Sequence, residues 1–145
     1  MTDRYILDTG PLGELSHPRA GLALAAVVLR KLNEDVELIV PEIADYEVRR
    51  ELIRARRSKG IARLDRIRRE YAFLPIDSAT MLRAAELWAS VRQTGNPTAD
   101  PKELDGDAIL AAQAELAGAV VLTENVGHLS LFVATVGWRE FLSEP

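Results

Sequence analysis

The chain of 145 residues contains no cysteine and only two histidines. The absence of cysteine excludes disulfide bonds, thiol nucleophiles and cysteine-ligated zinc or iron–sulfur sites. Two histidines are too few for a multi-histidine zinc site within one chain. The sequence also lacks an apolar run as long as a membrane span and a charged-then-apolar N-terminal segment. We therefore expect a cytoplasmic protein with no membrane partner.

Composition and length predict a single domain over residues 1–145. Hydrophobic residues make up 48% of the chain and charged residues 28%, a balance typical of globular proteins. Short apolar segments alternate with amphipathic ones, and strands are expected at residues 4–8, 37–40, 73–76, 119–123 and, weakly, 132–136. This alternation predicts an α/β fold, a three-layer α/β/α sandwich around a central, mainly parallel sheet.

Helices are expected between these strands, at residues 18–32, 42–55, 61–71, 79–94 and 104–116. Residues 10–12 are expected to form a turn and residues 95–101 a loop, because glycine and proline punctuate both segments. The expected boundary residues are Pro41 at a first helical position, Lys59 and Gly60 between two helices, Asp77 or Ser78 at an N-cap, and Gly118 at a helix end.

The net charge of −4 conceals a strong asymmetry. Ten basic and three acidic residues between positions 49 and 70 give this segment a charge of +7, so the rest of the chain carries −11. A basic patch on an acidic body fits a protein that grips a polyanion and holds cations elsewhere. A solvated helical face, or a surface for an acidic partner, gives the same pattern.

Acidic side chains lie where the ends of the expected strands would meet. Asp8 closes the first strand, Glu47 lies in the helix after the second, and Asp105 and Asp107 open the helix before the fourth. Ligands of parallel sheets bind at the carboxyl ends of the strands. Carboxylate oxygens suit hard divalent ions such as Mg²⁺, and ions held in this way commonly serve phosphodiester hydrolysis.

Four segments, in this order and spacing, resemble the PIN-domain nucleases, and most of all the VapC-like toxin ribonucleases. They are Ile6-Leu7-Asp8-Thr9, the stretch from Pro41 to Glu47-Val48-Arg49, Asp107-Ala108-Ile109-Leu110-Ala111-Ala112-Gln113-Ala114, and Leu122-Thr123-Glu124-Asn125-Val126-Gly127-His128. The resemblance implies an Mg²⁺- or Mn²⁺-dependent endoribonuclease that is the toxin of a toxin–antitoxin pair. It also implies an RNA substrate, a cognate antitoxin and a homodimer.

The resemblance implies a set of site residues as well. Asp8, Glu47 and Asp107 match the family's first three acidic positions, whereas Asn125 stands at the fourth, where Asp105 or Glu124 would have to supply the missing charge. The implied catalytic residues are Asp8, Glu47, Asp107 and Asn125. The implied metal ligands are Asp8, Asp107, Asp105 and Glu47, supported by Thr9, Thr123 and Glu124. The expected RNA contacts are Arg49, Arg50, Arg54, Arg56 and Arg57.

Structural roles compete with each of these assignments. Asp8 and Asp105 could cap helices, Glu47 could pair with Arg50, and Asn125 could serve only a turn. The main alternative for the whole chain is a non-catalytic PIN-like module that binds RNA or a protein through residues 49–69. Metal-dependent cleavage of RNA separates the two hypotheses.

Overall fold

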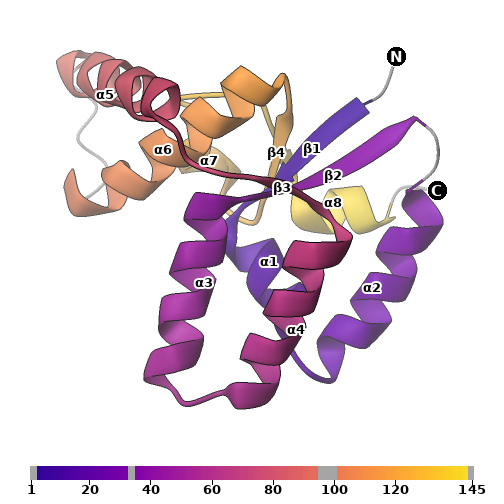
Figure 1. Ribbon diagram of the computed structural model, residues 1–145. Coiled ribbons are helices and arrows are strands. Elements are labelled where there is room, and N and C mark those ends of the chain that lie inside the picture. Colours follow the sequence, from indigo (N-terminus) through magenta and orange to yellow (C-terminus); the bar gives the residue numbers. More distant parts are fainter. Residues whose placement is uncertain (1–2, 33–34, 95–100, 144–145) are drawn as a thin grey trace.

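The computed structural model describes residues 3–32, 35–94 and 101–143, except for the side chains of residues 101–103 and 128. Five parallel strands form one sheet in the order β3-β2-β1-β4-β5, and Figure 1 shows helices around it. The strands are β1 (Asp3–Leu7), β2 (Val36–Pro41), β3 (Ala72–Leu74), β4 (Val120–Thr123) and β5 (Thr135–Gly137). The predicted α/β sandwich with a parallel sheet is confirmed.

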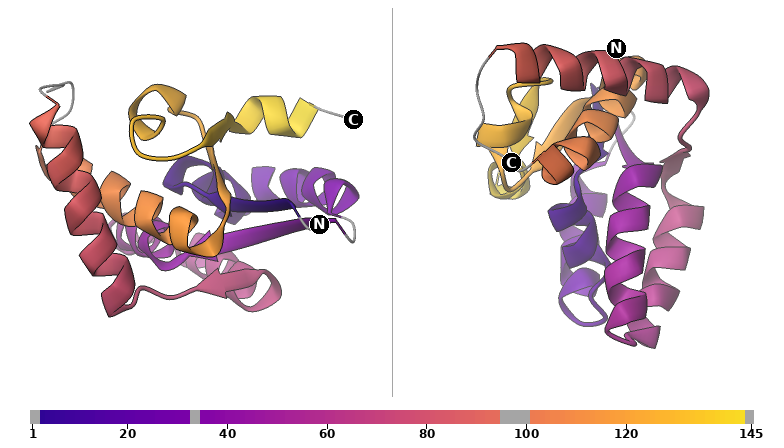
Figure 2. Two further views of the ribbon diagram at one scale, coloured as in Figure 1. Left: turned by 90° about the horizontal axis from the view of Figure 1, so that it is seen from above. Right: turned by 90° about the vertical axis from the view of Figure 1, so that its left-hand side faces the viewer.

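Two helices lie in each of the first three connections between strands, whereas α7 alone lies between β4 and β5, and α8 follows β5. The helices are α1 (Thr9–Ser16), α2 (Ala20–Lys31), α3 (Glu42–Arg54), α4 (Ser58–Glu70), α5 (Ser78–Gln93), α6 (Pro101–Ala117), α7 (Val126–Leu129) and α8 (Trp138–Ser143). Helices α3 and α4 form a long pair that extends away from the sheet, as Figures 1 and 2 show. In the described part of the chain no helix is both long and apolar enough for a membrane span.

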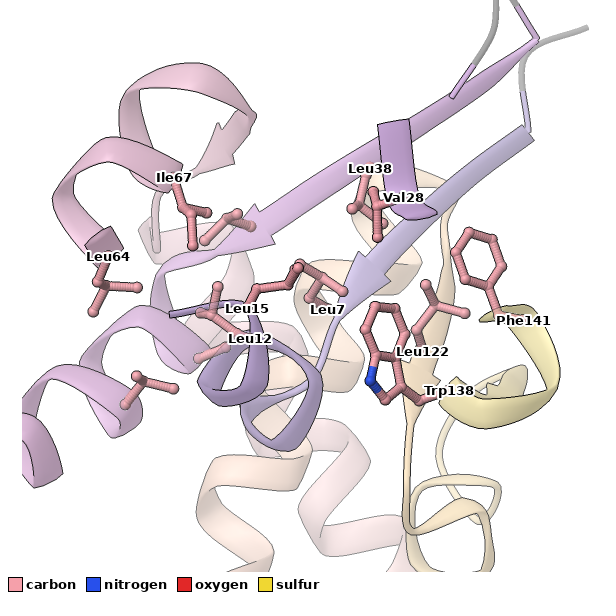
Figure 3. Packing of buried hydrophobic residues seen from close by; sticks show 13 residues of the cluster. Leu7, Leu12, Leu15, Val28, Leu38, Leu64, Ile67, Leu122, Trp138 and Phe141 are labelled. Atoms are coloured by element: carbon pink, nitrogen blue, oxygen red, sulfur yellow. The ribbon is translucent and has the colours of Figure 1, made fainter. Parts of the chain in front are cut away.

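The alternation of side chains along the strands builds a core on each face of the sheet. Leu7 of β1 and Leu122 of β4 belong to a cluster that α1, α2, α3, α4 and α8 cover, and Figure 3 shows its packing. Ile6 and Val121, one residue away on the same strands, belong to a second cluster, which α6 and α7 cover. Helix α5 packs on α6, where Ala84 and Leu87 meet Ala108, Ala111 and Ala112, rather than on the sheet.

The order of the strands creates a switch point between β1 and β4. From β1 the chain moves outward through β2 to β3, and it then returns past these strands to place β4 on the free side of β1. The backbone amide of Asp8 donates to the carbonyl of Leu122 over 3.0 Å, which joins the two strand ends. In open parallel sheets, the crevice at such a switch point is the usual place for a ligand.

The structure corrects several predicted boundaries. Residues 10–12 are not a turn but part of α1, because Asp8 caps that helix and Pro11 lies in its first turn, where proline is tolerated. Pro41 ends β2 and is the N-cap residue of α3, not its first helical residue. Asp77 does cap α5, and Gly118, with φ of 63°, does end α6.

The break between the two basic helices lies earlier than expected. It falls at residues 55–57, where the amides of Arg56 and Arg57 donate to the carbonyls of Ile53 and Leu52, and Arg56 takes a φ of 55°. This is a Schellman motif with arginine at the position that usually holds glycine. Gly60 instead lies in the first turn of α4, where a Cβ atom would be 2.9 Å from Leu52 Cδ2.

In the C-terminal half of the chain, two further boundaries differ from the predicted ones. The predicted loop at residues 95–101 lies almost wholly outside the described residues, and Pro101 already belongs to α6. Asp105 is therefore the fifth residue of that helix and not its N-cap. The weak edge strand is present, but as β5 at Thr135–Gly137, beside β4.

Candidate active site

An open cleft of about 750 Å³ lies at the switch point of the sheet. Its walls come from the β1–α1 junction, the first half of α3, the middle of α6 and the segment after β4. The predicted site residues that line it are Asp8, Thr9, Glu47, Arg50, Asp105, Asp107 and Asn125. Three segments far apart in the sequence thus bring four carboxylates to one cleft.

Asp8 is held by hydrogen bonds to both of its carboxylate oxygens. Its Oδ1 accepts from the backbone amide of Thr9 over 2.7 Å, and its Oδ2 accepts from the hydroxyl of Thr123 over 2.8 Å. Thr123 is fully buried, and its Oγ1 also accepts from the backbone amide of Asn125 over 2.9 Å. Asp8 is therefore the N-cap of α1, but it also lines the cleft. Each of its carboxylate oxygens keeps a lone pair that can bind a further group.

Glu47 reaches the cleft from the second turn of α3. Its Oε1 accepts from the Thr9 hydroxyl over 3.1 Å, and its Oε2 lies 3.7 Å from the Arg50 guanidinium. A Cβ atom at Gly106 would lie 3.1 Å from Oε2, so the absence of a side chain on α6 makes room for this carboxylate. The pKa of Glu47 is raised overall, and burial is the largest cause. The Thr9 hydrogen bond and Arg50 lower this pKa in part, and the negative charge of Asp8 raises it further.

Asp105 and Asp107 line the opposite wall, on α6. Asp105 is exposed and Asp107 is half-buried. In the residues that the structure describes, no three acidic or histidine side chains converge closely enough to form a metal cage. The chemistry of the set nonetheless fits a hard cation, because all four groups are carboxylates and the proximity of Asp8 disfavours ionisation of Glu47.

Glu124 does not line the cleft. Its carboxylate lies against Gly10 on the outer side of α1 and 3.4 Å from the Arg139 guanidinium. Arg139 also pairs with Glu14, which in turn accepts a hydrogen bond from the buried indole of Trp138. This network fastens the segment after β4 to α1 and α8.

The five arginines expected to contact RNA have different surroundings. Arg49 is bound to Asp45 over 3.0 Å and to Asp65 over 2.7 Å, and these carboxylates raise its pKa. Arg54 pairs with Glu51 in solvent, and Arg50 pairs weakly with Glu47 at the cleft. Arg56 and Arg57 lie beyond the end of α3 and line a different pocket.

Tyr46 is a cleft residue that the sequence pattern missed. The residue is 56% exposed, and the Arg50 guanidinium lies 5.2 Å from the centroid of its ring. Ile43 and Ile109 add an apolar floor. The signal that could have found Tyr46 is helical spacing, because it lies three residues after Ile43 and four before Arg50, on one face of α3.

Solved structures of similar fold align over nearly the whole chain. The first, VapBC2 from Rickettsia felis bound to a DNA fragment from its promoter, has a TM-score of 0.71 and 13% identity, covering 93% of this chain and 98% of that one. FitAcB from Neisseria gonorrhoeae has a TM-score of 0.66 and 22% identity over the same shares. VapBC-1 from nontypeable Haemophilus influenzae has a TM-score of 0.64 and 17% identity over 94% and 98%.

No curated protein sequence matches the chain significantly. The family model described as PIN domain, however, matches residues 5–129. This range begins within β1, extends beyond β4 and includes every residue that lines the cleft. The chain therefore belongs to the PIN domain family, with a fold like that of the VapC-type members.

Proposed function

We propose that this PIN domain is a divalent-cation-dependent endoribonuclease, and that it is the toxin of a toxin–antitoxin pair. The observation that carries the proposal is the Asp8 carboxylate, which two hydrogen bonds orient at the switch point, with Glu47, Asp105 and Asp107 around the same cleft. Membership of a nuclease family and the fold shared with VapBC and FitAB structures support it.

The residues that would hold the ion are Asp8 and Asp107, with Glu47 and Asp105 as further ligands. When bound, a divalent ion supplies Lewis acidity, which activates water as a nucleophile and offsets charge on the phosphate. A cation also offsets the mutual repulsion of the carboxylates that line the cleft, so ion binding is expected to stabilise the fold.

The other cleft residues would position these carboxylates and the substrate. The hydroxyls of Thr9 and Thr123 fix the orientations of Glu47 and Asp8, so that little ordering remains to be done when substrate binds. Arg50, which is half-exposed beside Glu47, can donate to a phosphate oxygen of the RNA. Asn125, at the rim, offers an amide that both donates and accepts, and so can orient water or a carboxylate.

The proposal is tested by cleavage of end-labelled single-stranded RNA by the purified chain in Mg²⁺, Mn²⁺ or EDTA. Asp8→Asn and Asp107→Asn are expected to abolish cutting, whereas Glu86→Gln, which removes a carboxylate on α5 outside the cleft, leaves it intact. RNA binding without cutting under every condition would instead support the non-catalytic binding module.

A protein partner follows from the toxin assignment. We propose a cognate antitoxin that holds the nuclease inactive, on the strength of the fold shared with VapBC and FitAB structures. A homodimer is proposed as well, and light scattering should then give twice the chain mass of 16.0 kDa. Inhibition of cleavage by the product of an adjacent small open reading frame would establish the antitoxin.

A further inference from the structure

A second pocket lies at the far end of the α3–α4 pair. It measures about 860 Å³ and is formed by the α1–α2 junction on one side and by the α3–α4 junction on the other. Its lining includes four cationic side chains, which are Arg19, Arg56, Arg57 and Lys59. Within the described parts of the chain, no carboxylate lines it. We call this concavity, which the four cationic residues line together with His17, the distal basic pocket.

The cations of this pocket differ from most other basic residues between positions 49 and 70, because no carboxylate of the described residues neutralises them. Arg49, Arg54 and Arg66 are each paired with a carboxylate of the chain. In the described residues, by contrast, no acidic side chain pairs with Arg19, Arg56, Arg57 or Lys59. Four like charges around one concavity repel one another, and an anion would relieve that cost.

The pocket has a defined frame. His17 Nδ1 accepts from the backbone amides of Arg19 and Ala20, both at 3.1 Å, which leaves Nε2 as the donor of the ring. Gly21 lets α1 and α2 approach closely, since a Cβ atom there would be 2.2 Å from the Leu15 carbonyl oxygen. Gly60 does the same for α3 and α4 at Leu52. The α1–α2 and α3–α4 junctions therefore hold the walls in place.

A groove connects this pocket to the catalytic cleft. A concavity of about 390 Å³ between α1 and α3 shares Thr9 and Glu47 with the cleft, and it shares Gly13, Leu52 and Arg57 with the distal basic pocket. From Glu47 to Arg54, where α3 ends, the helix rises over seven residues, which is about 10 Å along its axis, and Arg56 lies just beyond this end. A few nucleotides of single-stranded RNA can span this distance.

We infer that the distal basic pocket binds backbone phosphates of the RNA strand whose scissile phosphate lies in the catalytic cleft. This inference rests on the proposed function and adds a subsite to it. Leu52 and Ala55 give the groove apolar surface on which sugars and bases can rest, while phosphate oxygens reach the guanidinium groups beyond. The groove also carries the Glu51 carboxylate, which Arg54 neutralises over 2.9 Å. The pocket thus sets a minimum substrate length without reading sequence.

The test measures how tightly the full chain binds oligouridylates, from dinucleotide to dodecanucleotide, in EDTA and at several salt concentrations. For the wild-type chain, affinity is expected to rise at the length that first reaches the pocket. In R57Q/K59Q this rise disappears, and the slope of log K against log [salt] becomes shallower by about 0.7 for each phosphate that the pocket no longer binds. The cleavage rate on long RNA should fall toward that on short RNA.

Two further variants separate the loss of this subsite from a general loss of positive charge and from a loss of stability. Arg69→Gln removes an exposed charge from the last turn of α4, outside the pocket, and should change neither length dependence nor salt slope. Arg56→Gly removes a pocket charge where φ is 55°, a region that glycine adopts without strain. It should weaken binding of long RNA without lowering the melting temperature.

The outcomes distinguish this inference from the proposed function. If the wild type cuts RNA but R57Q/K59Q keeps the length dependence and the salt slope, the inference is overturned and the nuclease stands. If R57Q/K59Q instead loses binding of oligoglutamate with RNA binding unchanged, the pocket is a surface for acidic protein and the inference is again overturned. If the wild type neither binds nor cuts RNA, both fail.

Discussion

The Thr123 hydroxyl donates to Asp8 Oδ2 over 2.8 Å and, at the same time, accepts from the backbone amide of Asn125. One fully buried side chain on β4 therefore sets the orientation of the β1 carboxylate and the path of the chain after β4. A hydroxyl can donate only one hydrogen bond, and that of Thr123 is directed to Asp8. Thr123 links the two sides of the switch point.

Replacement of this hydroxyl tests its positioning role. Thr123→Val keeps the shape of the side chain but leaves Asp8 Oδ2 without its donor and the Asn125 amide without its acceptor. We expect RNA cleavage to fall by roughly tenfold to a hundredfold, as for other groups that orient metal ligands. Thr123→Ser restores the hydroxyl and should recover most of the rate. Equal rates for the Val and Ser variants would contradict the role.

Gly106→Ala should separate stability from activity. Alanine is favoured over glycine within a helix by about 1 kcal/mol, so α6 itself should gain stability. The new Cβ atom would lie 3.1 Å from Glu47 Oε2 and would push this carboxylate aside. We expect a melting temperature at least as high as that of the wild type and a cleavage rate lower by up to about a hundredfold. An unchanged rate would show that the position of Glu47 is not critical.

The raised pKa of Glu47 predicts a pH dependence of stability in the metal-free chain. Above the unfolded value, near 4.5, the unfolded chain loses this proton while the folded chain retains it. The contribution of Glu47 to stability is therefore greatest at low pH and is lost as pH rises through the folded pKa. Denaturant titrations in EDTA measure this. The free energy of unfolding of the wild type, relative to that of Glu47→Gln, should fall as pH rises from the unfolded value to the folded pKa of Glu47.

Addition of Mg²⁺ should reverse this loss at neutral pH, because a cation favours the ionised carboxylate. Glu86→Gln, which lies outside the cleft, provides the background pH profile. A difference between wild type and Glu47→Gln that stays constant with pH would rule out a role for Glu47 burial in stability.

Arg49 is expected to act through the fold rather than through RNA. It bridges Asp45, whose side chain is 4% exposed, to Asp65 on α4. Arg49→Gln leaves the buried Asp45 with only the longer contact to Arg68, so we expect the free energy of unfolding to decrease by about 1–3 kcal/mol. Under native conditions the Arg49→Gln variant should bind RNA as tightly as the wild type does. A tenfold lower affinity would instead establish Arg49 as a direct contact with RNA.

The parallel sheet was predictable because its strands are short apolar runs bounded by turn residues, and Gly118 and Asp77 mark boundaries by local chemistry alone. Helix α1 was not, because Gly10 and Pro11 are typical turn residues, and they outweighed the possibility that Asp8 caps a helix at this point. Gly60 misled in the same way, since its small size serves the contact with Leu52 and not a helix break.

The acidic cleft was predictable in outline because the ends of parallel strands share one edge of the sheet. What sequence could not supply are the contacts made across it. Nothing local to Gly106 indicates that it makes room for Glu47, and nothing local to Arg49 indicates that Asp45 and Asp65 neutralise it. The distal basic pocket depends likewise on the approach of the α1–α2 junction to Arg57.

The central claim, that the carboxylates of this cleft hydrolyse RNA, is tested most directly by single-turnover cleavage of single-stranded RNA during a Mn²⁺ titration. The wild-type rate should rise with Mn²⁺ to saturation and vanish in EDTA. Asp8→Asn should lower the saturated rate by about a thousandfold, corresponding to a decrease of several kcal/mol in transition-state stabilisation. A wild-type rate that persists in EDTA, or an Asp8→Asn rate equal to it, would contradict the account.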